Sequence, residues 1–456
     1  MTIAALRLVP PRVIPPAQPL AGLAFLASFV RNPLSVVPQA AYDGDLVAMM
    51  RGNTPILWIT APALVRQVLL DERDKFLKLA QIRLLSPLLG KGILTSEGAD
   101  WKWQRQASAP MFRPQELAGF VPSFVRAAEE VLARWRARPG EQAVDRDMTE
   151  ATFQVISATL LPSADARMPQ AIERSTGLFQ RSGAWGQLYA VANLPKWLPQ
   201  PGRLSMARAV AALRSAVLSL IGERRAGGAQ KDDLLHRLML ARDPETGQSM
   251  NDEQLVDNLL TFYLAGHETT AKALTWTLYL VARSPAWARA LKDEVERVTG
   301  GAELRAEHVA QLSLTQQVLK ESMRLFPPVP LMTRQAVADT MLGGHAVRAG
   351  SSVVMPIYAI HRHARRWEDP DAFEPGRFAP EREAAIPRFQ YMPFGAGPRI
   401  CIGMGFAMLE AAAMLATFVR HAEFAPVPGR EPAPVARVTL IPGGGMPLEV
   451  RLRPRG

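Results

Sequence analysis

The single cysteine of this chain, Cys401, lies in the stretch FGAGPRICIG at residues 394–403, among three glycines and one arginine. An apolar segment at 404–419 follows directly and predicts a helix. A helix N-terminus offers free N–H groups and a positive dipole end, which both stabilise a thiolate, and Arg399 adds a cation. A lone cysteine is usually a small inert hydrophobic residue, but this neighbourhood favours a thiolate that reacts or binds a metal. With one cysteine, an intramolecular disulfide and a zinc site of paired cysteines are excluded.

A second chemical segment, AGHETT at residues 265–270, interrupts the longest predicted helix. Gly266 costs a helix about 1 kcal/mol relative to alanine, so the segment needs a compensating role. Glu268 is a desolvated carboxylate and therefore a candidate proton carrier, with Thr269 as a neighbouring hydroxyl donor and acceptor. The simpler alternative is that the hydroxyl bonds the preceding helical turn and the glutamate pairs with a neighbouring base.

Gly266 also has a possible role in ligand binding. Its missing side chain would let a flat ligand lie against the helix, and Ala265 and Thr269, four residues apart, would share the face presented to it. Lys272 falls close to that same face, where an apolar ligand would disfavour it, so we expect its stem to lie along the helix and its charge to reach a rim or a carboxylate.

Three Glu-x-x-Arg pairs occur in the chain, and only their surroundings separate them, because such pairs are mostly weak surface contacts. Glu321 and Arg324 are flanked by apolar residues, so we expect them to be buried. The pair at 294 and 297 lies in the charged run KDEVER and is expected at the surface. The third pair lies at 374 and 377.

Helices are expected to dominate and to position these groups. The texture from 101 to 300 is helical, and the longest helix begins at Asn251, with Gln254 completing a capping box, and runs to Ser284 before Pro285. Its apolar residues surround the whole circumference, which indicates a buried helix of roughly 50 Å. The remaining predicted elements are a strand at 55–60, a short helix at 63–70, a strand at 352–355 and a last hairpin around 442–445.

The composition fits a globular protein, with 48% hydrophobic and 21% charged residues among 456. The net charge is +11, but the arginines are scattered, which argues against nucleic-acid binding and only weakly favours an acidic protein partner. The apolar run at 20–30 is far below the ~20 residues that span a bilayer, so no transmembrane anchor is expected. The prolines before this run and the missing cleavage site argue against a secretory signal.

Together these segments resemble the cytochrome P450 superfamily, the haem-thiolate monooxygenases. FGAGPRICIG matches the family's haem-ligand loop, Phe-x-x-Gly-x-Arg-x-Cys-x-Gly, at every fixed position. AGHETT resembles its oxygen-activating motif, KESMR its Glu-x-x-Arg pair, and EPGRF the segment that supplies a second arginine. Length alone favours two or three domains, whereas the resemblance implies a mainly α fold with a small β region, as a single large domain at 41–456 after a Pro-rich segment at 1–40. A haem would lie between the long central helix and the helix that follows the cysteine loop.

The resemblance also implies roles for individual residues. Cys401 would be the axial thiolate of haem b (iron protoporphyrin IX), whose electron donation helps cleave the O–O bond. Glu268 and Thr269 would be catalytic and deliver protons to the distal oxygen. A second group would hold the haem propionates by charge-assisted bonds, namely Trp101, Arg105, Arg334 and Arg399. Other cofactor contacts are expected from Ala265, Gly266, Phe394, Gly395 and Gly403, and Glu321, Arg324 and Arg377 would form a buried structural triad.

The implied activity is O2 activation and hydroxylation or epoxidation of a lipophilic small molecule. Because no anchor is visible, the chain resembles the soluble bacterial members of the family more than the membrane-bound ones. We therefore expect a cytoplasmic protein that takes electrons from a separate ferredoxin or flavodoxin with its reductase. Nothing in the chain resembles a fused reductase. Lys102, Arg113 and HRHARR at 361–366 would contribute to a positive surface for an acidic partner, although simple solvated arginines are the alternative.

Other functions remain open at this stage. A haem-thiolate peroxygenase or isomerase would use peroxide or no external oxidant, and a haem sensor or carrier would not need both Glu268 and Thr269. A cysteine hydrolase would use Cys401 as its nucleophile. Fatty acids, terpenoids, steroids and hydrocarbons all fit the apolar segments expected around the pocket. Arg83 could anchor a carboxylate and favour fatty acids, but we expect it to face solvent.

Overall fold

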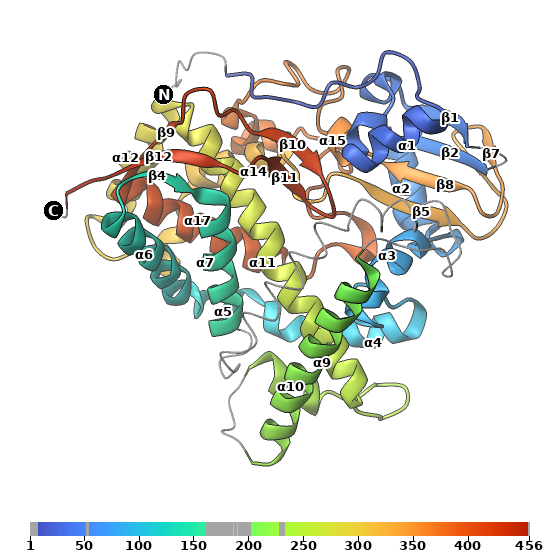
Figure 1. Cartoon of the computed structure of the whole chain (residues 1–456), viewed down its shortest axis with the longest axis horizontal. Helices are drawn as coiled ribbons and strands as arrows, with labels where there is room; N and C mark the ends of the chain where they lie inside the picture. Colours follow the sequence, from blue (N-terminus) through green and yellow to red (C-terminus); the bar gives the residue numbers. More distant parts are fainter. Residues whose placement is uncertain are drawn as a thin grey trace.

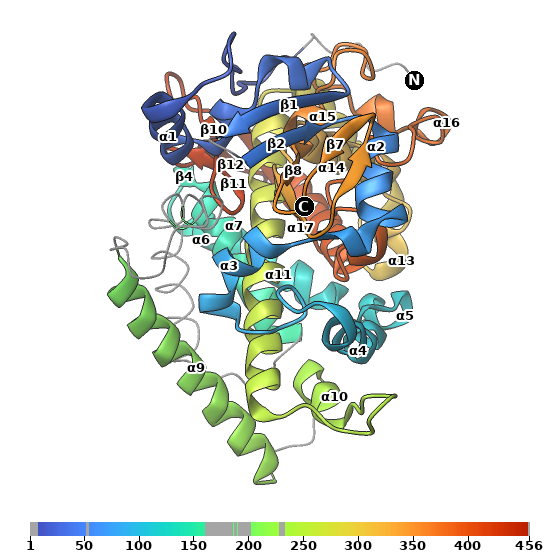
Figure 2. The same ribbon diagram turned by 90° about the vertical axis from the view of Figure 1, so that its right-hand side faces the viewer.

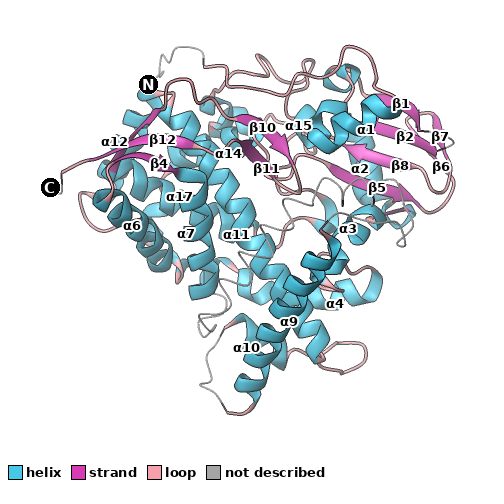
Figure 3. Ribbon diagram, in the orientation of Figure 1, coloured by secondary structure: helices cyan, strands magenta, loops and turns pink. Residues whose placement is uncertain are grey.

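The protein is described here by a computed structural model that covers residues 8–51, 54–159, 186, 189, 202–227 and 233–454. Helices form most of it, and the strands gather mainly in one separate region (Figures 1 and 3). The helices are α1 Gly22–Arg31, α2 Pro62–Arg66, α3 Leu79–Leu89, α4 Gly98–Ser108, α5 Pro114–Ala118, α6 Val121–Ala137, α7 Val144–Thr159, α9 Arg203–Arg225, α10 Leu234–Leu240, α11 Asp252–Ala282, α12 Pro285–Thr299, α13 Ala306–Val309, α14 Ser313–Leu325, α15 Ile357–Ile360, α16 Pro380–Glu383 and α17 Met404–His421. The predicted mainly α fold is confirmed.

Within the described residues the strands form four small sheets. They are β1 Leu46–Arg51, β2 Thr54–Ile59, β3 Phe76–Leu77, β4 Gly140–Ala143, β5 Met332–Ala336, β6 Thr340–Leu342, β7 His345–Val347, β8 Ser352–Met355, β9 Ala422–Pro426, β10 Ala433–Ala436, β11 Leu440–Gly443 and β12 Pro447–Leu452. The largest sheet has the order β1-β2-β8-β5-β3, with β2 and β8 parallel and the other pairs antiparallel. A second sheet has the order β4-β12-β9, while β10-β11 and β6-β7 are two-stranded.

Helix α11 crosses the whole body and is the element around which the others pack (Figure 2). Its predicted capping box is confirmed: the Asn251 side chain accepts from the Gln254 backbone N–H at 2.9 Å, and the Gln254 side chain accepts from the Asn251 N–H at 3.0 Å. The helix ends at Ala282, two residues before the predicted end, and Pro285 opens α12 instead. Proline suits this position because the first turn of a helix leaves its N–H unpaired.

One continuous hydrophobic cluster joins α11 with α6, α7, α14 and α17, and it extends to Leu34, Val36 and Val37 near the start of the chain. A second cluster lies on the five-stranded sheet. Within the described residues, α9 is long and apolar enough to cross a membrane by length and composition; a helix of a soluble protein's core meets the same criterion.

The last predicted hairpin is wrong in position. The strands that pair are β10 and β11, which are joined by residues 437–439, whereas Gly444 and Gly445 connect β11 to β12, a strand of another sheet. The glycines adopt φ of +86° and +85°, a conformation that only glycine reaches without strain. A glycine run marks a sharp change of direction, but it does not reveal which strands pair across it.

Candidate functional site

The loop that carries the cysteine is shaped by two of its three glycines. Gly395 and Gly397 have φ of +73° and +70°, and a Cβ on Gly397 would lie 2.5 Å from the carbonyl oxygen of Leu69. Gly397 is therefore required both by its backbone conformation and by close packing. The backbone N–H of Cys401 donates to the carbonyl of Phe394 at 3.0 Å and closes the loop. Gly403 precedes the first residue of α17, as the sequence predicts.

The thiol of Cys401 lies deep in the protein and yet is exposed. Burial raises its pKa, while the backbone N–H of Gly403 and the charge of Arg105 act in the opposite direction. The thiolate predicted from the sequence therefore stays a prediction. A coordinated metal ion would produce it, because a metal ion deprotonates a ligating thiol.

The middle of α11 has an open face. From Leu255 to Ala282 every residue is buried except four, namely Leu264, Ala265, Gly266 and Thr269. Ala265 is the most exposed of them and supports the predicted ligand face. Gly266 has a different explanation, because a Cβ there would lie 2.7 Å from Cδ1 of Ile156 on α7. The glycine therefore allows two helices to pack closely, and its role as a cofactor contact stays a prediction.

The acid and the alcohol of AGHETT make the contacts of the simpler alternative. The hydroxyl of Thr269 donates to the carbonyl of Ala265 at 2.9 Å, one turn back, and remains able to accept a hydrogen bond. Glu268 is buried, and its Oε1 lies 3.8 Å from Nζ of Lys272. The expectation that the charge of Lys272 reaches a carboxylate is confirmed. The catalytic roles of Glu268 and Thr269 stay predictions.

Cationic side chains from four separate segments gather beside the cysteine loop. Arg399 forms an ion pair with Glu97, donates to the carbonyl of Ser96 at 2.9 Å, and stacks 3.9 Å above the ring of Trp101. Arg105 on α4 donates to the carbonyl of Ile400 at 2.8 Å. Trp101, Arg105 and Arg399, which the sequence analysis grouped, are therefore brought together by contacts.

Arg334 on β5 and Lys78, at the start of α3, complete this cationic cluster. Burial lowers the pKa of Arg334 to about 10, with Arg399 lowering it further and Glu97 opposing the shift. Burial likewise lowers the pKa of Lys78 to about 7, followed by the charges of Arg399 and Arg334. These buried cations repel one another, and the carboxylate of Glu97 opposes that repulsion.

The cationic cluster fits the two propionates of a haem. Buried cations need counter-charge, and three of them, Lys78, Arg334 and Arg399, share Glu97. Among the described residues, Nη1 of Arg399 is buried without a hydrogen-bond acceptor. A dianionic edge would supply both the charge and the acceptors. The exposed thiol of Cys401 matches the axial ligand of a haem, and the cationic cluster matches the charge of its propionates. The open face of α11 offers an uncovered surface to a flat ligand.

Sequence reasoning missed Lys78 and Glu97. Lys78 interrupts the apolar run around Leu77 and Leu79, and a lone charge in such a run could have identified it. Its ammonium donates to the carbonyl of Leu94 at 2.8 Å, which ties the start of α3 to the segment before α4. Glu97 carried no signal, because an acidic residue before a helix is common.

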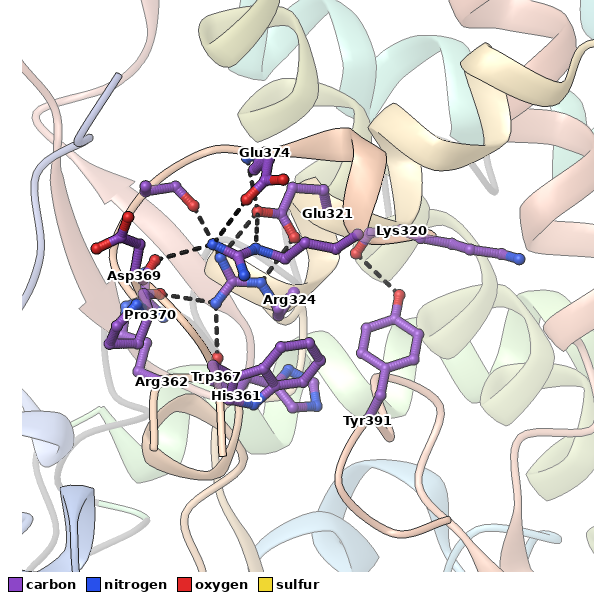
Figure 4. Close-up of polar contacts among 12 residues, drawn as sticks. Lys320, Glu321, Arg324, His361, Arg362, Trp367, Asp369, Pro370, Glu374 and Tyr391 are labelled. Atoms are coloured by element: carbon purple, nitrogen blue, oxygen red, sulfur yellow. Dashed lines mark hydrogen bonds and ion pairs between the residues drawn. The ribbon is translucent and has the colours of Figure 1, made fainter. Parts of the chain in front are cut away.

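The predicted buried triad is present (Figure 4). Arg324 binds both carboxylate oxygens of Glu321, with Nε to Oε2 at 2.7 Å and Nη2 to Oε1 at 2.8 Å. Arg377 lies 3.4 Å from Oε1 of Glu321 and 3.2 Å from Glu374. Arg324 also donates to three backbone carbonyls, those of His361, Pro370 and Ala372. These contacts join α14 to the segment that leads towards the cysteine loop.

One surface expectation is wrong, and a second is met only in part. Glu294 is only 2% exposed and accepts from the backbone N–H groups of Leu314 and Thr315 at 2.7 and 2.9 Å, so it caps α14. In HRHARR the first three residues are buried, and Arg362 stacks 3.8 Å above the ring of Tyr358. Arg365 and Arg366 both pair with Asp45. Both charge-rich segments thus contain buried groups: Glu294 caps a helix, and Arg362 stacks on an aromatic ring.

Comparison with known proteins is consistent with this site. Residues 13–446 match the cytochrome P450 family. The chain is 34% identical over 444 residues to cyclooctatin synthase of Streptomyces melanosporofaciens, covering 97% of this chain and 95% of that protein. It is 32% identical over 402 residues to cyclooctat-9-en-7-ol 5-monooxygenase of the same organism, covering 88% and 86%. Pentalenene oxygenase of Streptomyces avermitilis is 29% identical over 445 residues, covering 96% of each chain.

A solved structure of the cytochrome P450DA heme domain has the same fold. It superposes with a TM-score of 0.84 at 26% sequence identity, covering 97% of this chain and 98% of that one. The likeness therefore extends over nearly the whole chain.

Proposed function

The chain belongs to the cytochrome P450 family, and from this premise we propose that it oxidises an apolar carbocyclic alkene or alkenol of the terpenoid class. It is a haem-dependent monooxygenase, like the relatives named as monooxygenases. The observation that carries the proposal is the exposed thiol of Cys401 beside buried cations, together with the open face of α11. These two parts differ in kind, because cations lie beside the cysteine loop while the open face of α11 offers Leu264 and Ala265.

The residues of the site would divide the work of holding the cofactor. Cys401 would ligate the iron through its sulfur. Lys78, Arg334 and Arg399 would hold the propionates, and Arg105 would fix the loop through the carbonyl of Ile400. The haem supplies the binding and activation of O2 once it is bound. Phe394 and Gly395 would shape the loop. The carbonyl of Phe394 accepts a hydrogen bond from the N–H of Cys401, and Gly395 adopts a positive φ.

Glu268 and Thr269 would handle protons on the open face of α11. The hydroxyl of Thr269 already donates to Ala265, so it would accept a proton from a water or from Glu268 and pass on its own. Glu268 lies at the edge of that face, 3.8 Å from Lys272. Its carboxylate would take up protons from solvent and carry them towards the hydroxyl.

The substrate class rests on two observations. Cyclooctat-9-en-7-ol and pentalenene, in the names of two relatives, denote an alkenol and an alkene. Arg83, the residue that could have favoured fatty acids, is exposed, and its Nη2 lies 3.5 Å from the side-chain oxygen of Gln335. An apolar molecule without a carboxylate therefore suits the site better than a fatty acid.

The test is a screen of substrate-induced spin-state shifts in the haem absorption spectrum. Carbocyclic alkenes and alkenols should shift the Soret band at micromolar concentrations, while fatty acids of equal carbon number should need far more. A matched pair, an alkenol and the carboxylic acid derived from it, isolates the effect of the charge. Tighter binding of the acid, lost in Arg83→Gln, would contradict the proposal.

For electron supply we propose a separate acidic ferredoxin or flavodoxin that docks on exposed basic residues near the cysteine loop. Arg113 is exposed there, next to Phe112, whose ring is 3.8 Å from a Cβ built on Gly403. Lys102 is also exposed and lies 3.6 Å from Glu245.

Reduction by ferredoxin should slow with added salt. Arg113→Glu should slow it further, whereas Arg365→Glu, in the HRHARR segment, should not; equal rates for both variants would contradict this docking surface. A cytoplasmic location and the lack of a membrane anchor stay predictions.

A further inference from the structure

The carboxylate of Glu268 lies where three elements meet. It belongs to α11, and its Oε1 accepts a hydrogen bond from the hydroxyl of Thr439 at 3.1 Å, in the turn between β10 and β11. Nζ of Lys272 is 3.8 Å from the same oxygen. Lys272 in turn donates to Thr149 of α7 at 3.2 Å. The side chains of Glu268 and Lys272 are only 11% and 7% exposed.

The direction of the hydrogen bonds is fixed by this arrangement. The hydroxyl of Thr149 donates to the carbonyl of Asp145 at 2.7 Å, so it accepts from Lys272. At 3.8 Å, Lys272 attracts Glu268 by charge without a hydrogen bond. Oε1 of Glu268 therefore accepts its hydrogen bond from the hydroxyl of Thr439 and not from the ammonium of Lys272. Thr439 and Lys272 compete for one oxygen, and Thr439 holds the hydrogen bond.

The position of Thr439 is fixed by its neighbours. The next residue, Leu440, is fully buried. Its N–H donates to the carbonyl of Pro328 at 2.9 Å, and its own carbonyl accepts from Nε1 of Trp276, on α11, at 3.0 Å. The turn is thus anchored to the same helix that carries Glu268. A hydroxyl held this firmly can define where a flexible carboxylate rests.

We propose that Thr439 is a positioning residue for the proton carrier Glu268. Its hydroxyl holds the carboxylate away from direct contact with Lys272, and so keeps it available for proton transfer at the edge of the open face of α11. The inference rests on the proposed role of Glu268. Without the hydroxyl, Glu268 closes onto Lys272 as a direct ion pair of the i, i+4 kind and becomes a poorer proton carrier.

The first experiment measures how electrons are divided between product and peroxide in Thr439→Val, which keeps the shape of the side chain. A hydrogen bond to a charged group is worth enough to change the population of the bound conformer about tenfold. We expect unchanged substrate affinity and a several-fold lower yield of product per electron, with more peroxide. Thr439→Ser should restore the yield. Thr275→Val, which removes a buried hydroxyl on α11 that donates to the carbonyl of Ala271, should leave it normal.

The second experiment compares Glu268→Ala, Thr439→Val and the double variant, in both electron coupling and the melting temperature of the holoprotein. Thr439→Val should lower both in the wild-type background and change neither further in Glu268→Ala, because the acceptor is gone. Normal coupling in Thr439→Val beside poor coupling in Glu268→Ala would overturn this inference alone. Normal coupling in Glu268→Ala would overturn the proposed proton role and the inference with it. Additive losses in the double variant would also refute the positioning role.

Discussion

Replacement of Arg324 by methionine tests whether the buried triad stabilises the fold. Methionine keeps much of the side-chain volume but leaves the buried Glu321 without its bidentate partner. The carbonyls of His361, Pro370 and Ala372 lose donors as well. Removing one partner of a buried ion pair costs about 3–5 kcal/mol, and unpaired buried carbonyls add to it. A loss of about 5 kcal/mol in the free energy of unfolding is therefore expected.

This loss translates into a measurable fall in melting temperature. At about 2 cal/mol/K per residue, a chain of this size unfolds with an entropy change of about 1 kcal/mol/K, so 5 kcal/mol lowers the melting temperature by about 5 °C. Native proteins have only about 5–15 kcal/mol of stability, so a reduced yield of haem-loaded protein is also expected. Melting of the holoprotein, followed at the Soret band, provides the assay.

The matched control is Lys320→Met on the same helix. Lys320 pairs with Glu383 at 2.7 Å, but the two side chains are 25% and 37% exposed. Exposed pairs contribute up to about 1 kcal/mol, so its melting temperature should fall by about 1 °C or less. Arg377→Met, which removes the longer contact to Glu321, should lie between the two. If Arg324→Met melted within a degree of Lys320→Met, the triad would not have the stabilising role inferred here.

Three further predictions follow from other contacts. Thr269→Ala should bind substrate normally but divert electrons to peroxide or water, and full coupling in this variant would contradict the relay role. The pKa of Lys78 is lowered from 10.5 to about 7, so between these pH values unfolding of the haem-free protein takes up a proton. Its free energy of unfolding should therefore rise with pH by up to about 1.4 kcal/mol per pH unit. In urea titrations at several pH values, Lys78→Met should flatten this slope. Glu294→Gln should destabilise by about 2 kcal/mol through its lost charged cap, while the exposed Glu296→Gln should change stability by less than about 0.5 kcal/mol; equal urea midpoints would refute the cap.

Local patterns were reliable where the interacting residues are close in the sequence. The capping box of Asn251 and Gln254 and the pairing of Glu321 with Arg324 each span three residues, so a helix brings them together whatever surrounds it. Burial of the second pair followed from its apolar flanks. Glu294 failed this reasoning, because its charged flanks face solvent while its own side chain turns to the start of α14, twenty residues away.

The glycines show the same limit. Gly395 and Gly397 need positive φ, which is a local property, and the sequence pattern identified them. Gly266 looked like room for a ligand, but it is room for Ile156, a residue 110 positions earlier. A missing side chain indicates a close approach without naming the neighbour.

The sequence by itself determined the family and the central helix, and it predicted the thiol ligand and the acid and alcohol pair, because these depend on short motifs and on local periodicity. Only the tertiary structure brought Lys78, Arg334 and Arg399 into one cationic cluster around Glu97. It also placed Thr439 against Glu268 across 171 residues of chain. Such contacts arise when separate elements bury their apolar faces together, and the polar groups at the seams then take whatever partners the packing brings within reach.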